Sequence, residues 1–281
     1  MRRFYVNAFL ISALCFAIVA AGESTSAVAA SEGDAVLAAD SALLAALGKA
    51  DKSDADKLLD RDFTWVDVNA NERTRAQVLD SPPTVANADV QPKVRLYGKA
   101  AVVKADRGKA YVMRIWVKRG AAWRALLYQE VTLESLPPNP PAPPGSSTDC
   151  DNPCKNYPYQ AKNKTEKEVL ASLHQVIMGL AYHDPDSYDA GTADEFEVTI
   201  STSKTVFTKP DRLALIRQLQ KAGVPPGIPA PVTSAKMFNL GNAVVLKQYQ
   251  TTRNGKHDVN TRMWTRRGDR WLQLFSFETI G

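Results

Sequence analysis

Two glutamates occupy equivalent positions near the ends of the two halves of this chain. Glu130 and Glu278 are 148 residues apart, and the same separation relates Arg114 to Arg262. A carboxyl group that lies among apolar side chains has a raised pKa and can act as a general acid or base. Glu130 and Glu278 are therefore the candidate catalytic residues. The alternative is that each is a surface carboxylate paired with a neighbouring arginine.

Aromatic and basic side chains near these glutamates are candidates for binding a ligand. Because a strand alternates its faces, Arg114 shares one face with Trp116, and Tyr128 shares another with Glu130. Aromatic rings line many small-molecule sites, although the same residues also serve as core packing. The candidate ligand-binding residues are Trp65, Trp116, Tyr128, Arg114, Trp264 and Arg262. The sequence shows no metal-ligand spacing and no glycine-rich phosphate loop, and it therefore predicts no metal and no cofactor.

The two halves of the chain repeat one pattern. The segments 114–123 and 262–271 each begin Arg-x-Trp, carry a glycine at the seventh position and end on a tryptophan. Upstream, Ala-Val-Val at 101–103 matches Ala-Val-Val at 243–245 with a separation of 142 residues. The difference of six residues indicates a longer hairpin around 251–259, where Asn254-Gly255 is a turn signal. Two copies indicate a duplicated domain, since a solenoid needs three or more repeats.

The sequence of each copy predicts helices followed by a series of strands. Apolar residues at helical spacing predict helices over 33–49 and 166–182. Second, short helices are expected from about 51–54 and from Asp184-Pro185, an N-cap followed by proline at the first helical position. First strands are expected at 63–66 and 196–200, short helices at 74–80 and 209–220, and three or four antiparallel strands at about 93–133 and 232–278. This order predicts an α+β fold in each copy.

The chain divides into four predicted segments. Residues 1–30 have the charged start, apolar stretch and small residues of a signal peptide, which favours a periplasmic or secreted protein without a stable membrane anchor after cleavage. The two domains are expected at 31–135 and 164–281. Between them, 136–163 is a proline-rich linker of extended character. An oxidising compartment would allow a disulfide between Cys150 and Cys154, which would stiffen the linker.

Composition and charge restrict the class of partner. The 281 residues include 35 Lys and Arg against 30 Asp and Glu, a formal net charge of +5. This small positive charge is spread along the chain without a basic stripe, so nucleic acid is not an expected partner.

Short segments in both copies resemble a known superfamily. In the first copy these are Leu58-Leu59-Asp60, 62–66 (Asp-Phe-Thr-Trp-Val), 74–79 and 120–124, and in the second 193–198, 208–212 and 262–264. They resemble the SnoaL-like members of the nuclear-transport-factor-2-like (NTF2-like) superfamily, and most of all its domain of unknown function 4440 group. The resemblance implies two cone-shaped domains, each a curved antiparallel sheet wrapped around a long N-terminal helix. Because such domains commonly pair as dimers, we expect the two copies to pack sheet to sheet as an intramolecular pseudo-dimer.

Three functions fit these observations. The first is an exported bacterial protein that binds a small apolar or aromatic molecule in a cone-shaped pocket. The second is an isomerase, cyclase or hydratase that uses general acid–base catalysis. The third is a non-catalytic module for protein–protein interaction. Fold alone does not separate them, and whether the protein is an enzyme stays open at this point.

Overall fold

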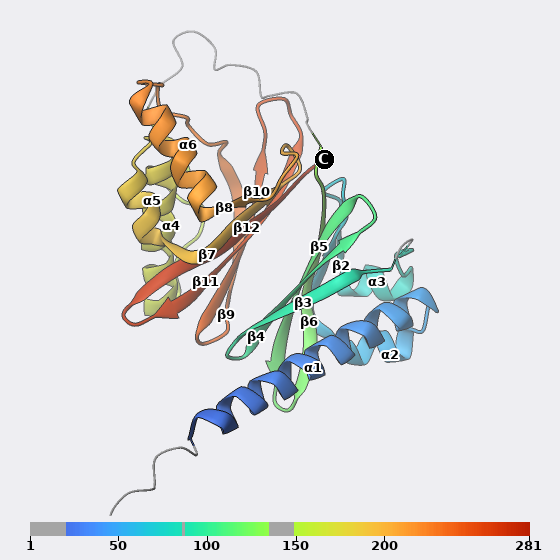
Figure 1. Ribbon diagram of the computed structural model, residues 1–281. Coiled ribbons are helices and arrows are strands. Elements are labelled where there is room, and N and C mark those ends of the chain that lie inside the picture. The colour runs from blue at the N-terminus through green and yellow to red at the C-terminus, as the bar shows by residue number, and fades with distance from the viewer. Residues whose placement is uncertain (1–20, 86–87, 135–148) are drawn as a thin grey trace, which may run out of the picture.

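The computed structural model describes residues 21–85, 88–134 and 149–281, with side chains from residue 32 onward. Two domains follow one another along the chain, and each is a six-stranded sheet with three helices (Figure 1). The predicted α+β class with two tandem domains is thereby confirmed. Residues 1–20 of the predicted signal peptide and 135–148 of the predicted linker lie outside the described residues.

The first domain begins with a long helix and ends with a four-stranded meander. Its elements are α1 (Ala21–Gly48), α2 (Lys52–Leu58), β1 (Leu59–Val66), β2 (Glu72–Thr74), α3 (Arg75–Asp80), β3 (Val90–Tyr97), β4 (Ala100–Arg107), β5 (Ala110–Arg119) and β6 (Ala122–Thr132). The strand order is β2-β1-β6-β5-β4-β3. Helix α1 contains Ala21–Ala30, the last part of the predicted signal peptide. Among the described residues no helix is both long and apolar enough to cross a membrane.

The second domain repeats this order with a shorter first helix and a longer third one. Its elements are α4 (Lys164–Ala181), α5 (Pro185–Gly191), β7 (Thr192–Ile200), β8 (Phe207–Thr208), α6 (Lys209–Lys221), β9 (Val232–Asn239), β10 (Ala243–Thr251), β11 (His257–Arg267) and β12 (Arg270–Ile280). The strand order is β8-β7-β12-β11-β10-β9. Asp184 caps α5 through its side chain, as the sequence predicts, and Thr208 caps α6 in the same way.

In each sheet the four strands of the meander are antiparallel, as expected, and the first strand of the domain makes the sheet mixed. The last strand of each meander lies beside the first strand of its domain, and the pairs β1–β6 and β7–β12 run parallel. The reason is the connection after the first strand. A short strand and a helix carry the chain across the domain before the meander begins, so its fourth strand returns in the direction of the first.

The repeated Arg-x-Trp segments form equivalent hairpins with equivalent irregularities. Gly120 and Gly268 both have a φ of 62°, a conformation that favours glycine, in the turns that join β5 to β6 and β11 to β12. The register shifts between Ile115 and Trp116 in one hairpin, and between Met263 and Trp264 in the other. The shift places two consecutive apolar residues of each last strand, Leu126-Leu127 and Leu274-Phe275, in one cluster.

The convex faces of the two sheets face each other, and the helices cover the outer faces (Figure 1). One cluster of buried side chains is drawn from both domains: Ala100, Val102, Met113, Ile115, Val117, Leu126, Leu127, Val131, Ala193, Leu240, Ala243, Val245, Met263, Leu274, Phe275 and Phe277. At its edge, Gln129 donates from Nε2 to the carbonyl of Val259 and accepts from the Thr261 hydroxyl at 2.6 Å. Lys247 of the second domain forms an ion pair of 2.8 Å with Glu72 of the first.

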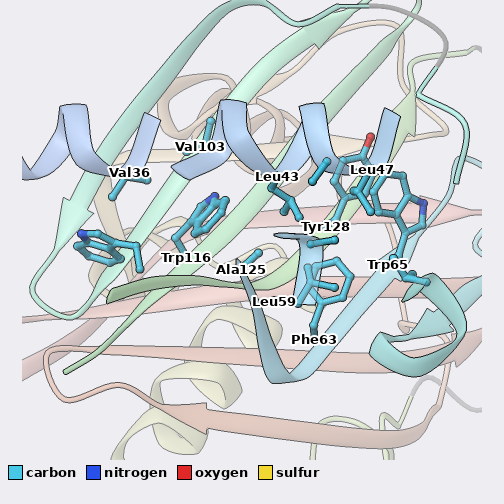
Figure 2. Packing of buried hydrophobic residues seen from close by; sticks show 14 of the residues in the cluster. Val36, Leu43, Leu47, Leu59, Phe63, Trp65, Val103, Trp116, Ala125 and Tyr128 are labelled. Atoms are coloured by element: carbon cyan, nitrogen blue, oxygen red, sulfur yellow. The ribbon is translucent and has the colours of Figure 1, made fainter. Parts of the chain in front are cut away.

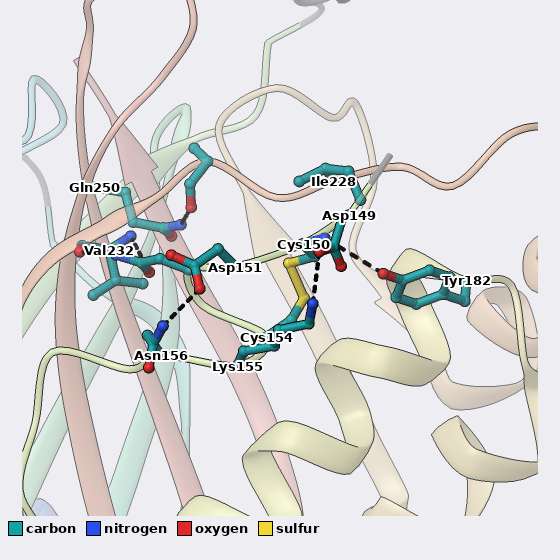
Figure 3. Close-up of a disulfide and its surroundings, with 12 residues drawn as sticks. Asp149, Cys150, Asp151, Cys154, Lys155, Asn156, Tyr182, Ile228, Val232 and Gln250 are labelled. Atoms are coloured by element: carbon teal, nitrogen blue, oxygen red, sulfur yellow. Dashed lines mark hydrogen bonds and ion pairs between the residues drawn. A yellow bond between two sulfur atoms is a disulfide. The ribbon is translucent and has the colours of Figure 1, made fainter. Parts of the chain in front are cut away.

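A disulfide joins Cys150 to Cys154 just before the second domain (Figure 3). Both cysteines are buried in the cluster that α4 forms with the sheet, together with Trp264 and Trp271. The amide nitrogen of Cys150 donates to the hydroxyl of Tyr182 at the end of α4. Burial of both cysteines and the hydrogen bond to Tyr182 hold this part of the predicted linker against the second domain.

Candidate functional site

The concave face of the first sheet holds a buried arginine between two aspartates. Arg114 is fully buried on β5, and its guanidinium donates to both carboxylate oxygens of Asp40 on α1, at 2.6 and 2.7 Å. The carboxylate of Asp89 also forms an ion pair with Arg114. The indole nitrogen of Trp116 donates to Asp40 at 2.9 Å. The charge of Arg114 is thus compensated inside the domain, and these two carboxylates raise its pKa against the opposing effect of burial.

The other predicted residues of the first domain belong to the same packed interior. Trp65 stacks on Tyr128 with 3.3 Å between the ring centres, and both lie in the main hydrophobic cluster (Figure 2). The hydroxyl of Tyr128 donates to Glu130 and accepts from Arg107, which also lies 3.4 Å from Glu130. Burial, followed by the charge of Glu130, raises the pKa of Tyr128. Glu130 therefore lies in a closed network of charged partners.

The second domain keeps the arginine and tryptophan but replaces the aspartate. Ser172 of α4 takes the place of Asp40, because its hydroxyl accepts from the indole nitrogen of Trp264 at 3.2 Å. Arg262, the counterpart of Arg114, therefore has no carboxylate on the helix opposite. Among the described residues no ion pair involves Arg262, and its buried Nε atom has no hydrogen-bond partner.

Two carboxyl groups lie together on the same face as Arg262. Asp258 of β11 is 4 % exposed, and Glu278 of β12 is partly buried beside it. Asn260 donates from Nδ2 to Glu278 at 2.9 Å and in turn accepts from the Ser276 hydroxyl at the same distance. Burial and the neighbouring charge of Glu278 raise the pKa of Asp258 to about 10. Burial also raises the pKa of Glu278, against the opposing charge of Arg262.

These pKa directions mean that the pair holds a proton at neutral pH. Two adjacent buried carboxyl groups cannot both ionise without a large cost, so one of them stays neutral and can donate a hydrogen bond. The Oδ1 atom of Asp258 nevertheless has no partner among the described residues. The guanidinium of Arg212 on α6 also acts on Glu278 by its charge, and its Nε atom is likewise buried without a partner. Two positive charges and a proton-bearing pair therefore converge on this part of the second domain.

We name the set Asp258, Asn260, Arg262, Glu278 and Arg212 the carboxyl-pair site. Sequence reasoning selected Arg262 and Glu278 from it and missed the other three. The signal that could have found two of these is the alternation of β11, where Asp258, Asn260 and Arg262 occupy every second position opposite Val259 and Met263. Arg212 lies on a helix 50 residues upstream, and no spacing rule connects it to β11.

The structure separates the predicted ligand-binding residues into two groups. Trp65, Arg114, Trp116 and Tyr128 are buried in the interior of the first domain, where each contacts another side chain of that domain. Trp264 is buried at the second domain's helix, and Arg262 is partly exposed beside the carboxyl pair. Their roles in binding stay predictions. Within the part of the chain that the structure describes, no three His, Cys, Asp or Glu side chains gather as they would around a metal ion.

The carboxyl pair predicts a specific dependence of stability on pH. Because the folded pKa of each group is raised, the folded protein binds more protons than the unfolded chain above about pH 4, so stability falls as the pH rises towards 10. Asp258→Asn removes one titrating group. The change that it causes in the free energy of unfolding is expected to be about 1–3 kcal/mol more favourable at pH 8 than at pH 4. Urea unfolding at both pH values measures this. An Asp258→Asn effect that is equal at the two pH values would rule out the raised pKa.

Comparisons with known proteins identify no function for this chain. No protein-family model matches the chain, and neither does any curated protein. Solved structures do match, each over about one domain. An NTF2-like protein with a cystatin-like fold from Novosphingobium aromaticivorans has 11% identity and a TM-score of 0.36, and the match covers 43% of this chain and 94% of that one. An NTF2-like protein of unknown function in nutrient uptake from Rhodospirillum rubrum has 21% identity and a TM-score of 0.29, covering 35% and 98%. The hub of the S. rosetta kinase CaMKII has 18% identity and a TM-score of 0.30, covering 35% and 94%.

The order of elements defines the fold of each domain. In each domain helices precede a curved sheet that ends in a four-stranded meander, and the first long helix lies against the concave face. This is the NTF2-like fold in two tandem copies, as the resemblance in the sequence predicts. The two copies differ in the interior, where the first has a compensated arginine and the second has the carboxyl-pair site.

Proposed function

We propose that this protein binds a small organic acid at the carboxyl-pair site of its second domain. The observation that carries the proposal is the convergence of three buried atoms that lack hydrogen-bond partners among the described residues: Asp258 Oδ1, Arg262 Nε and Arg212 Nε. Buried polar atoms are nearly always paired, so such a group of unpaired atoms is typical of a site completed by a ligand or water. The proton held between Asp258 and Glu278 reduces the negative charge of the pair, and the two guanidinium groups favour an anion.

The polar surroundings change the expected chemistry of the ligand. The same concave face carries Gln248 and Gln250, both buried, and the hydroxyl of Tyr157 donates to Gln248 at 3.0 Å. Gln248 also donates to Gln250 at 2.8 Å, so these amides form a polar wall beside the carboxyl pair, and an apolar or aromatic molecule would find few apolar contacts there. We therefore propose a ligand with carboxylate or carbonyl oxygens in place of the apolar ligand that the tryptophans alone predict.

Thermal unfolding with small aliphatic acids tests this proposal. Acetate, butyrate and succinate are compared with the neutral amides of the same acids at pH 6. An acid present at ten times its dissociation constant is expected to add about 1.4 kcal/mol to the free energy of unfolding, a rise of about 3–6 °C in Tm. The effect should be smaller above about pH 10, where Asp258 ionises and the carboxyl pair carries more negative charge.

Two matched variants locate the effect. Arg262→Gln is expected to abolish the stabilisation by acids. Glu130→Gln, at the position equivalent to Glu278 in the first domain, should leave it unchanged. Equal stabilisation of Arg262→Gln and the unmodified protein would refute the proposed site.

An acid–base enzyme is the second candidate, and the carboxyl pair specifically favours it. A carboxyl group with a raised pKa beside one that can ionise provides both a proton donor and a proton acceptor. Catalysis and binding are separable by Glu278→Gln. An enzyme would lose turnover while it still binds the acid, whereas a binding protein would show no turnover in either form.

We also propose that the two domains form one permanent unit and that the protein is exported. The cluster of buried side chains that both sheets share and the buried Gln129–Thr261 hydrogen bond support a permanent unit. The N-terminal sequence pattern and the Cys150–Cys154 disulfide support export. N-terminal sequencing of the protein from its host would identify the cleavage site, expected near residue 30. An intact N-terminus at Met1 would contradict export through a cleaved signal peptide.

A further inference from the structure

A groove of about 300 Å³ lies between the two domains, apart from the carboxyl-pair site. Strands β3 to β5 of the first domain form one side, and β7 and β12 of the second form the other. Alternation along β12 separates the two places: Phe275 and Phe277 line the groove, whereas Ser276 and Glu278 lie on the opposite, concave face. A ligand in this groove would therefore contact both domains without touching the carboxyl pair.

The floor of the groove is aromatic and apolar. Phe275 and Phe277 continue the buried cluster between the sheets, together with Val102. Tyr97 and Tyr111 add further rings to the walls, and Tyr111 is 37 % exposed. The volume lies at the lower end of the range for sites that enclose small molecules, and it fits a molecule of one or two rings.

The cationic side chains around this floor outnumber the carboxylates. Lys104 lies 4.6 Å from the ring centre of Phe275 and forms an ion pair with Glu197. Lys93 and Arg95 also line the groove from β3, and neither forms an ion pair with a carboxylate of the described residues. Asp106 is the remaining acidic residue of the lining. Three cations therefore face two carboxylates beside an aromatic floor.

We propose that this groove binds an aromatic anion, a small molecule whose flat ring lies against the accessible rings of Tyr97 and Tyr111 and whose carboxylate or sulfonate faces Arg95 and Lys93. Stacking on aromatic side chains and apolar burial favour the ring, and a guanidinium favours the acid because of its charge and its paired donors. The site exists only where the domains pack together, so an occupant would also hold them in this arrangement.

Fluorescence titration with 8-anilinonaphthalene-1-sulfonate, an aromatic anion, tests the proposal. N-phenyl-1-naphthylamine has the same rings without the sulfonate and serves as the neutral probe. Arg95→Gln is expected to weaken binding of the sulfonate about threefold to tenfold and to leave the neutral probe within twofold. Arg270→Gln, an exposed arginine on the β11–β12 hairpin, is the matched control and should change neither.

Two further variants make the outcome decisive. Val206→Trp places a large side chain on the lining of the groove and should weaken both probes at least tenfold, with thermal unfolding showing that the protein still folds. Arg262→Gln should leave both probes unaffected, so failure of the acid-binding proposal and failure of this one are distinguishable. No binding of the sulfonate by the unmodified protein, equal binding by Arg95→Gln, or a loss caused by Arg262→Gln would each overturn the assignment.

Discussion

Asp40→Asn is expected to lower the free energy of unfolding by about 3 kcal/mol. The substitution keeps an oxygen that can accept from the indole of Trp116, but it removes the charge that compensates Arg114. Arg114 is fully buried and would retain only Asp89 as an ionic partner. Because a buried charge that loses its partner costs far more than a lost neutral hydrogen bond, the effect should be among the largest of any single polar substitution. Urea unfolding measures it.

The second domain provides the matched control for this prediction. Ser172→Ala removes the hydrogen bond from Trp264 that corresponds to the Asp40–Trp116 contact and a second one to the carbonyl of Trp271, and it should cost about 1–2 kcal/mol because no charge is involved. In a double-mutant cycle, Asp40→Asn should cost much less once Arg114→Met has removed the guanidinium. An Asp40→Asn effect no larger than that of Ser172→Ala would mean that Arg114 is not held by this ion pair.

Phe277→Ala is expected to destabilise the protein by about 3–5 kcal/mol. Phe277 is 1 % exposed and packs in the cluster that both sheets share. Its truncation leaves a cavity between the domains, where backbone hydrogen bonds of β11 and β12 restrict collapse. Because the cluster couples the domains, the variant should also split a single unfolding transition into two.

The control for Phe277→Ala is a substitution on the surface. Val224 is 41 % exposed after α6, and Val224→Ala should change stability by less than about 0.5 kcal/mol. Small-angle scattering distinguishes the cause of a large effect: closely packed domains have a smaller radius of gyration than separated ones. A loss below about 1 kcal/mol for Phe277→Ala, or scattering that shows two separate lobes in the unmodified protein, would contradict a permanent domain pair.

The fold followed from sequence where the signal was local or repeated. The spacing of Trp116 and Trp123 recurs at Trp264 and Trp271, and this repetition identified two copies and their hairpins. The cap at Asp184 was also predictable, since it depends on residues within one helical turn. The parallel pairing of β1 with β6 was not, because adjacency of strands far apart in the chain leaves no periodic signal.

The site was only partly predictable for the same physical reason. Glu278 and Arg262 were selected because they are equivalent to Glu130 and Arg114 in the repeat. Their surroundings differ from those of Glu130 and Arg114 because the first helix of the second domain has a serine where that of the first domain has an aspartate. Asp40 of the first domain lies 74 residues before the arginine that it neutralises, and its counterpart in the second domain is a serine. Whether an arginine is compensated is decided by such distant contacts, which a strand pattern does not contain.

Native mass spectrometry of the protein purified from its own host tests most directly whether the second domain holds the ligand. We predict a small bound molecule, released as an organic acid, on the unmodified protein and on Glu130→Gln, and its absence from Arg262→Gln. These variants alter equivalent networks in the two domains, so their comparison assigns the ligand to one interior. The same adduct on Arg262→Gln together with its loss from Glu130→Gln would contradict the assignment and place binding in the first domain.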